Sequence, residues 1–149
     1  MDSIAKLISS IGQKAKNASN TLRVASTDTK NSALLNIASE IQENQDIILD
    51  ANNKDLIVAK NNNIDDALLD RLMLNNERLQ GVVEGLKQIV SLDDPIGGVS
   101  ELVKRPSGIE IGKMRVPLGV IGMIYESRPN VTVDAAALCI KSGNAIILR

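Results

Sequence analysis

The sequence contains no histidine, no phenylalanine and no tryptophan, and it has one tyrosine and one cysteine among its 149 residues. The lack of histidine excludes histidine-based acid–base catalysis and histidine metal sites from this chain, and no metal site is predicted. A single cysteine cannot form an internal disulfide, which fits a reducing compartment. The scarcity of aromatic side chains argues against modules that bind nucleic acid by stacking its bases.

Net charge and hydropathy also argue against binding to nucleic acid and against a place in a membrane. The formal net charge is −1, so no strong electrostatic attraction to nucleic acid or to a membrane surface is expected. No apolar run approaches the roughly 20 residues that a membrane-spanning helix needs. The N-terminal residues Met1-Asp2-Ser3-Ile4 lack the charged and apolar regions of a signal peptide. We therefore expect a cytoplasmic protein that binds neither nucleic acid nor membranes.

Apolar residues at helical spacing predict a series of amphipathic helices over the first 90 residues, and we expect their apolar faces to form core. The first predicted face comprises Ile4, Leu7, Ile8, Ile11, Ala15 and Ala18, and the second, after a start signal at Ser26-Thr27-Asp28, comprises Leu34, Ile37, Ala38, Ile41, Ile48 and Leu49. A shorter helix is predicted at 53–60, and a fourth follows a capping Asp65. The clearest stripe belongs to a fifth helix, capped by Asn75 or Asn76: Leu79, Val82, Val83, Leu86, Ile89 and Val90.

The pattern changes after Asp93-Asp94-Pro95-Ile96-Gly97-Gly98. Pro106-Ser107-Gly108 is a turn signal between segments 99–105 and 109–116, so a β-hairpin is predicted there. Within it, Gly112 is expected to mark a bulge, because the apolar alternation resumes at Met114.

The last third of the sequence predicts a strand–helix–strand unit. The apolar run 120–125 is typical of a strand that is buried on both faces, and a helix is expected at 132–141. Gly143 suits the position after a helix end, and a second apolar run, 145–148, follows. Two strands joined by a helix should be parallel, with a right-handed crossover.

Ligands of open α/β sheets bind beyond the carboxyl ends of the strands. In this sequence that place corresponds to the loop 126–130 and to Arg149, which closes the second strand. Pro129 disfavours the helical conformation at Arg128, so the loop should stay extended up to the helix. A helix N-terminus and two arginines at one end of a sheet favour an anion, in particular a phosphate.

Three segments carry a resemblance to a known family: YESRPNVTVDAAALC from Tyr125 to Cys139, KSGNAIILR from Lys141 to Arg149, and DPIG from Asp94 to Gly97. They resemble the signature of the gamma-glutamyl phosphate reductases, also called glutamate-5-semialdehyde dehydrogenases, of the aldehyde dehydrogenase superfamily. The match is nearly continuous from Asp94 onward and rests on the helical layout before that.

The resemblance implies an α/β fold, in which helices and a hairpin precede the start of a Rossmann-like parallel sheet. It implies that residues 1–98 are the helical part of a nucleotide-binding domain, 99–116 an oligomerisation arm, and 117–149 the first βαβ unit. The alternative for 99–116 is a hairpin that packs on its own domain. The catalytic domain with its nucleophilic cysteine is expected to lie outside this chain, so the 149 residues alone should be inactive.

The activity implied by the resemblance is the reduction of gamma-glutamyl phosphate by NADPH to glutamate-5-semialdehyde and phosphate, in proline biosynthesis, by a homo-oligomer. One alternative is another acyl-dehydrogenase of the superfamily. A different class of alternative is a non-catalytic module that serves only assembly.

The resemblance also implies roles for individual residues. Glu126, Ser127, Arg128 and Arg149 are the expected cofactor-binding residues. Arg149 stands five positions after the Gly-Asn turn, where a basic side chain reaches the ribose and, in NADPH, its 2′-phosphate; the alternative is a solvated strand end. Asn130 is either a helix cap or a hydrogen-bond donor to the oxyanion of the reacting carbonyl, and Arg128 competes for the latter place.

Cys139 is expected to be structural. It lies within the apolar helical segment Ala135-Ala136-Ala137-Leu138-Cys139-Ile140, and the chain has no histidine to activate it. A buried cysteine behaves as a small apolar residue with a raised pKa.

Overall fold

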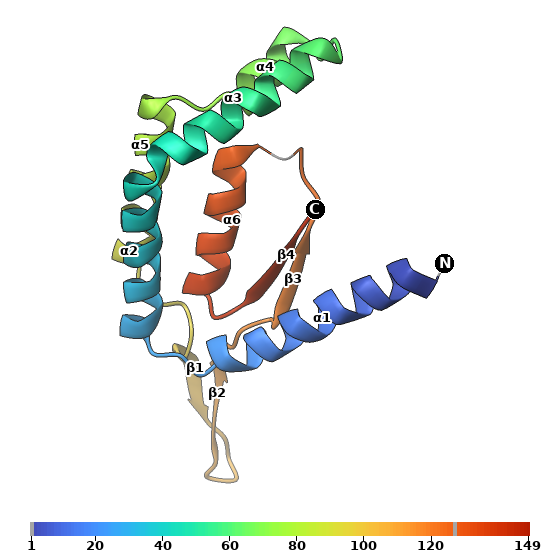
Figure 1. The fold of residues 1–149 in the computed structure, drawn as a ribbon. Helices are drawn as coiled ribbons and strands as arrows, with labels where there is room; N and C mark the ends of the chain where they lie inside the picture. Colours follow the sequence, from blue (N-terminus) through green and yellow to red (C-terminus); the bar gives the residue numbers. More distant parts are fainter. Residues whose placement is uncertain (1, 127) are drawn as a thin grey trace.

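The structure, a computed structural model, describes residues 2–126 and 128–149 (Figure 1). The elements are, in order, α1 (Asp2–Leu22), α2 (Thr27–Glu43), α3 (Gln45–Asn61), α4 (Asp66–Leu72), α5 (Asn76–Ser91), β1 (Val99–Lys104), β2 (Glu110–Met114), β3 (Val120–Met123), α6 (Pro129–Lys141) and β4 (Ala145–Leu148). β1 and β2 form an antiparallel pair, and β3 and β4 form a parallel pair.

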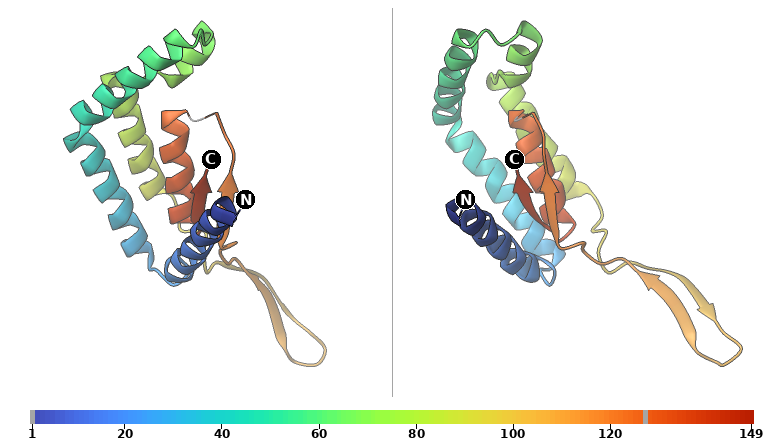
Figure 2. Two further views of the ribbon diagram at one scale, coloured as in Figure 1. Left: turned by 45° about the vertical axis from the view of Figure 1, so that its right-hand side comes forward. Right: turned by 90° about the vertical axis from the view of Figure 1, so that its right-hand side faces the viewer.

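Helices α2, α5 and α6 pack side by side and form the core (Figures 1 and 2). The residues buried between them are Leu34, Ala38, Val83, Leu86, Ile89 and Ala137. The predicted caps are confirmed: the side chains of Ser26, Asp65 and Asn75 accept hydrogen bonds from the first turns of α2, α4 and α5. Each cap satisfies an amide that the helix itself leaves unpaired.

The prediction of one helical face from Leu34 to Leu49 is wrong, because α2 ends at Glu43. The side chain of Asn44 donates to the carbonyl oxygen of Glu40 at 2.8 Å, which satisfies a helix-terminal acceptor. A new helix, α3, begins at Gln45 and runs to Asn61, so it is longer than the predicted 53–60 and contains Ile48 and Leu49.

The predicted strand–helix–strand unit is confirmed, with β3 and β4 parallel and α6 as the crossover. Helix α6 begins at Pro129, three residues before the predicted start, because proline suits the first position of a helix. At the other end, Gly143 has a φ of +70°, and the side chain of Asn144 accepts a hydrogen bond from the amide of Gly119 at 2.8 Å. That bond fixes the turn after α6 to the start of β3.

The prediction that 120–125 is buried on both faces is wrong for this chain. The side chains of β3 alternate between exposed and half-buried, and Ile124 is 88% exposed. Helix α6 covers one face of the strand pair. The other face is contacted only by the C-terminal half of α1, because the N-terminal half of that helix points away from the strands (Figure 2).

The expected burial of the first helical face is wrong for its N-terminal half. Ala15 of α1 is buried, but Ile4, Leu7 and Ile8 are more than half exposed. This exposed face continues into an apolar groove that runs between α1 and β4 and is lined on the strand side by Ala145–Leu148. None of the helices in the described part of the chain combines the length and the apolar character that crossing a bilayer requires.

The β1–β2 hairpin projects away from the helices (Figure 2), and every residue of its two strands is exposed. The hairpin itself was predicted, but its bulge lies opposite Gly112 and not at it. Two residues of β1, Glu101 and Leu102, face Gly112 where the register shifts, and Glu101 has a φ of +56°. An added Cβ on Gly112 would lie 3.0 Å from Leu102 Cδ1, so a larger residue there would require the Leu102 side chain to shift.

Two buried lysines, Lys30 and Lys141, connect α2 to the segment after α5 and α6 to α5 and α2. Lys30 of α2 forms a salt bridge of 2.5 Å with Asp94, whose carboxylate also accepts hydrogen bonds from the Thr27 hydroxyl and the Ile96 amide. Burial raises the pKa of Asp94, but these partners outweigh it and lower the pKa to about 2. Lys141, at the end of α6, donates to the carbonyl oxygen of Val90 in α5 at 2.9 Å and to Asn31 of α2 at 2.8 Å.

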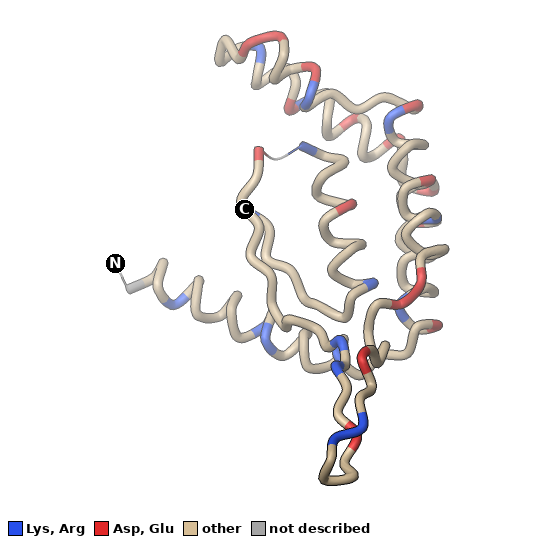
Figure 3. Tube along the Cα trace, turned by 180° about the vertical axis from the view of Figure 1, so that it is seen from behind, with Lys and Arg blue, Asp and Glu red and all other residues tan. Residues whose placement is uncertain are grey.

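Over the rest of the described chain, basic and acidic residues are interspersed (Figure 3).

Candidate functional site

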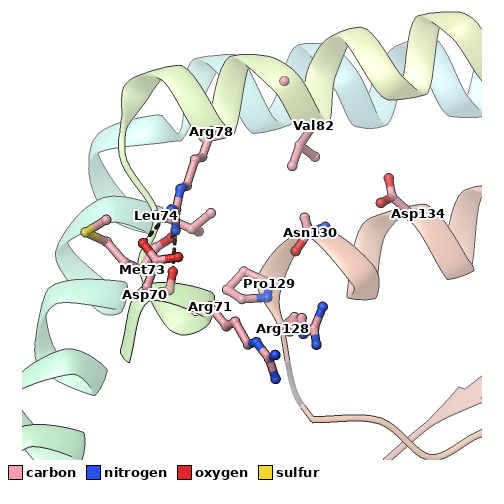
Figure 4. Close-up of a pocket in the computed structure, with 11 residues that line it drawn as sticks. Asp70, Arg71, Met73, Leu74, Arg78, Val82, Arg128, Pro129, Asn130 and Asp134 are labelled. Atoms are coloured by element: carbon pink, nitrogen blue, oxygen red, sulfur yellow. Dashed lines mark hydrogen bonds and ion pairs between the residues drawn. The ribbon is translucent and has the colours of Figure 1, made fainter. Parts of the chain in front are cut away.

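A cleft of about 400 Å³ lies where α5 and α6 begin, between the α4–α5 connection and the start of α6 (Figure 4). Its lining residues are Asp70, Arg71, Met73, Leu74, Arg78, Gly81, Val82, Arg128, Pro129, Asn130 and Asp134. Since β3 leads into this region through the loop before α6, the cleft lies at the carboxyl end of the strand pair, where the sequence predicts ligand binding.

The residues on either side of position 127 are fixed in the structure. Arg128 is the N-cap residue of α6, with φ −61° and ψ 127°, as the following proline predicts. Tyr125, just after β3, is fixed twice: its amide donates to the carbonyl of Arg149 at 3.0 Å, and its hydroxyl lies 2.6 Å from Thr132 Oγ1. These bonds connect the strand pair to the first turn of α6 on both sides of the loop.

The carboxylate of Glu126 lies between two guanidinium groups. Arg128 Nη2 is 3.1 Å from Glu126 Oε2, and Arg71 Nη1 of α4 is 3.2 Å from the same oxygen. Hydrogen bonds from Arg128 and then its charge lower the pKa of Glu126 against the opposing effect of desolvation, and Arg71 adds a smaller lowering effect. Two of the predicted cofactor-binding residues, Glu126 and Arg128, are thus paired with each other in this structure.

Arg71 and Arg78, from the other side of the cleft, were not predicted. Arg78 donates to the backbone carbonyl of Met73 at 3.0 Å and pairs with the carboxylate of Asp70 at 2.7 Å. The buried side chain of Asn52 donates to the Leu72 carbonyl at 2.9 Å and accepts from the Leu74 amide at 2.7 Å. These contacts fix the α4–α5 connection and therefore the backbone that carries Arg71.

Asn130 is not the helix cap, because Arg128 occupies that position and Asn130 lies in the first turn of α6. Its side chain points into the cleft (Figure 4). Burial raises the pKa of Asp134, one turn further along α6, while a hydrogen bond from Asn130 acts in the opposite direction. The cap alternative is excluded, and the role of Asn130 as an oxyanion donor stays a prediction.

Arg149 is exposed at the end of β4 and does not line the cleft. Its backbone extends the parallel pair, since its amide donates to the Met123 carbonyl at 2.9 Å. Among the described residues, no carboxylate pairs with its guanidinium, in contrast to Arg128. Ser127, the remaining predicted cofactor-binding residue, lies outside the described residues.

The structure confirms that Cys139 is buried, on the face of α6 that packs inward. Burial raises the pKa of its thiol, which disfavours the thiolate form that a nucleophile needs.

Within 2–126 and 128–149, no cluster of three or more acidic or cysteine side chains is arranged to hold a metal ion.

No family model matches the chain. Curated relatives do: the chain is 61% identical over all its 149 residues to the gamma-glutamyl phosphate reductase of Ruthia magnifica subsp. Calyptogena magnifica, and covers 36% of that protein. It is 56% identical over 137 residues to the enzyme of the same name from Caldanaerobacter subterraneus subsp. tengcongensis, of which it covers 33%. The chain therefore spans about a third of the length of these relatives.

Solved structures give the same result. The gamma-glutamyl phosphate reductase of Thermotoga maritima matches 92% of the chain with a TM-score of 0.88 and 42% identity, and the chain covers 33% of that structure. The enzyme of the same name from Saccharomyces cerevisiae matches 94% with a TM-score of 0.89 and 35% identity, at 36% coverage of that structure. The predicted α/β fold class and the predicted resemblance are both confirmed.

Proposed function

We propose that the chain, which has the sequence and the fold of gamma-glutamyl phosphate reductases over the part of them that it spans, is the N-terminal portion of such an enzyme. The complete protein would reduce gamma-glutamyl phosphate to glutamate-5-semialdehyde and phosphate, in the cytoplasm and in proline biosynthesis. The observation that carries this proposal is 61% identity over all 149 residues to a relative of that name. The residues 1–98, 99–116 and 117–149 would be the helical part, the oligomerisation arm and the first βαβ unit of its nucleotide-binding domain.

The site residues divide between two positions. Arg128 and Asn130 line the cleft at the start of α6, and one of them would face the reacting carbonyl. Asn130 would act there as an oxyanion donor, because its amide is at the helix N-terminus, where negative charge is favoured. The nucleophilic cysteine would come from a segment outside this chain, which agrees with the buried position of Cys139.

The cofactor would be NADPH, which supplies the hydride when bound. Arg149 fits such a role: it lies at the carboxyl end of β4, and its backbone is fixed by the strand pair. A guanidinium in that setting suits a 2′-phosphate. Glu126, Ser127 and Arg128 would belong to the loop between this cofactor site and the cleft.

The hairpin would join copies of the protein. Its apolar side chains are exposed over both strands, and an isolated two-stranded hairpin is of marginal stability in water. A homo-oligomer would cover this surface. Against the alternative that the hairpin packs on its own domain, the strands project away from the described helices (Figure 2).

The proposal is tested with the full-length protein in the reverse direction, by following the reduction of NADP⁺ with glutamate-5-semialdehyde and phosphate. Turnover with this substrate and not with other aldehydes separates the proposed enzyme from another acyl-dehydrogenase. Absence of both turnover and NADPH binding would support a non-catalytic assembly module.

Arg149→Ala should raise the Kd for NADPH roughly 10-fold or more, since a charged hydrogen bond contributes about 1.5–3 kcal/mol. Its effect on NADH should be much smaller; equal losses would contradict the assignment of Arg149.

A further inference from the structure

Glu126 occupies a position that suits a ligand carboxylate. Its Oε2 atom is shared by Arg71, which comes from α4, and by Arg128, which precedes α6. Arg71 and Arg128 both line the cleft, whereas Glu126 does not, so the two guanidinium groups meet this carboxylate beside the cleft. Planar guanidinium groups match carboxylates through paired N–H donors, so the same two side chains can hold another carboxylate in this place.

The backbones that carry the two arginines are fixed independently of Glu126. On one side, Asn52 holds the segment that follows Arg71 through the Leu72 carbonyl and the Leu74 amide. On the other side, the hydroxyl of Tyr125 contacts Thr132 in the first turn of α6. The positions from which the guanidinium groups reach into the cleft would therefore persist if Glu126 moved away.

The contacts of Glu126 are easily exchanged. The side chains of Arg71, Glu126 and Arg128 are 48%, 52% and 37% exposed, and ion pairs at this exposure contribute little to stability. Two cations share the one anion of Glu126, and the third carboxylate of the region, that of Asp134, makes no salt bridge to either arginine. The remaining arginine of the cleft, Arg78, is already paired with Asp70. An incoming carboxylate would thus compete with Glu126 for two arginines at a small cost.

We infer that Arg71 and Arg128 bind the carboxylate at the amino-acid end of the substrate, and that Glu126 holds this place until the substrate displaces it. The inference rests on the proposed function and adds the part of the substrate that this cleft recognises. The carboxylate is chosen because a carboxylate is the group that the two arginines hold in this structure, and the phosphate that the sequence pattern favoured here is the alternative that the kinetics separate. Glu126 and Arg128 are thereby assigned to the substrate and not to the cofactor, whose proposed anchor, Arg149, does not line the cleft.

The test is steady-state kinetics of the full-length protein in the reverse direction, with separate KM values for glutamate-5-semialdehyde, inorganic phosphate and NADP⁺. Arg71→Ala should raise the KM for the semialdehyde about 10-fold or more and leave the other two unchanged, because only the semialdehyde carries the carboxylate. Glu126→Gln should lower the same KM several-fold, since a neutral amide competes less well for the arginines.

The opposite signs of these two effects separate ligand binding from a structural ion pair. If the pair only braced α4 against the loop, both variants would raise KM values and lower the melting temperature together, and the inference would be wrong. A rise in the KM for phosphate in place of the semialdehyde would also overturn it. Arg71→Lys should fall between wild type and Arg71→Ala, because charge remains but the planar fork is lost.

Lys87→Ala is the matched control, since it removes a cation from an ion pair of similar exposure on α5, outside the cleft. It should leave all three KM values unchanged. An inactive wild-type protein would contradict the proposed function itself, whereas an active wild type with unchanged kinetics in Arg71→Ala would contradict only the carboxylate site.

Discussion

The helical body and the β1–β2 hairpin carry similar apolar residues in opposite environments. In the body, Leu34 and Leu86 are 0% and 2% exposed, whereas Leu102 and Met114 of the hairpin are 64% and 61% exposed. Both regions were predicted from regular apolar patterns. The comparison teaches that such a pattern identifies the element and the face that avoids water, but not where the covering surface comes from. In the body that surface is within the chain, and for the hairpin it would be another copy.

The largest difference between the two regions is expected from truncating one leucine in each. Leu86→Ala should destabilise the body by about 2–5 kcal/mol, because it removes a fully packed side chain from between α2, α5 and α6. Leu102→Ala should change stability by less than about 0.5 kcal/mol, as for other exposed sites. Native-state hydrogen exchange of the α5 amides in the full-length protein measures both. Equal losses of stability in Leu86→Ala and Leu102→Ala would show that the hairpin is folded against the body.

The second prediction concerns the pH dependence of the body. The folded-state pKa of Asp94 is about 2, below the ordinary value of 3.8, so its contacts stabilise the folded state above pH 3.8. This contribution, about 2 kcal/mol, is lost as the pH falls through about 2, because protonation breaks the salt bridge to Lys30. Asp94→Asn should lower stability at neutral pH and remove this part of the acid dependence, as measured by urea unfolding between pH 2 and 7. An unchanged acid profile in the variant would contradict the assignment.

An effect of similar size is expected at two glycines with positive φ. Gly143→Ala should cost about 1–2 kcal/mol from backbone strain, and more from contact, because the new Cβ would lie 2.9 Å from Pro117 Cγ. Gly97, with a φ of +84°, has no neighbouring atom within 4 Å of such a Cβ, so Gly97→Ala isolates the strain. Melting temperatures of the two variants give the comparison. Equal losses at the two positions would show that the contact with Pro117 is relieved by a shift of the loop, and a greater loss at Gly97 would contradict the prediction.

The smallest effect on folding should come from a polar change in the hairpin. Leu102→Ser should leave the melting temperature of the dissociated protein within error, because the side chain has no packed neighbours to lose in the body. It should instead weaken self-association, which sedimentation at a series of concentrations detects. Lys87→Ala serves as a surface control without an effect on assembly. Unaltered association would contradict the proposed role of the arm.

Local patterns were sufficient for most of the fold. The stripe from Leu79 to Val90 predicted α5 and its buried face, and capping side chains such as Ser26 and Asn75 marked where helices begin. The order of strand, helix and strand predicted a parallel pair, because a crossover of that length allows no other simple pairing. Errors arose where a polar residue makes a bond that ends a helix, as Asn44 does with Glu40.

The exposure of α1 and β3 could not be predicted, because burial depends on surfaces that the pattern does not contain. The site was predicted only in part, for a related reason. Arg128 and Asn130 follow directly from the strand–loop–helix sequence, but Arg71 meets Glu126 across 55 positions of the chain. No local signal in the short segment 66–72 marks that contact, since it depends on how α4 is folded back by Asn52 and Arg78.

The buried ammonium of Lys141 has a mechanical consequence for the cleft. It fastens the C-terminal end of α6 to Val90 near the end of α5 and to α2, while the cleft lies at the opposite ends of the same two helices. Helix α6 has 13 residues and is therefore about 20 Å long, so a tilt of about 3° around the fastened end moves its start by about 1 Å. Because Arg128 precedes this start, any tilt of α6 about its fastened end would change the spacing between Arg128 and Arg71, and the two lysine hydrogen bonds oppose such a tilt.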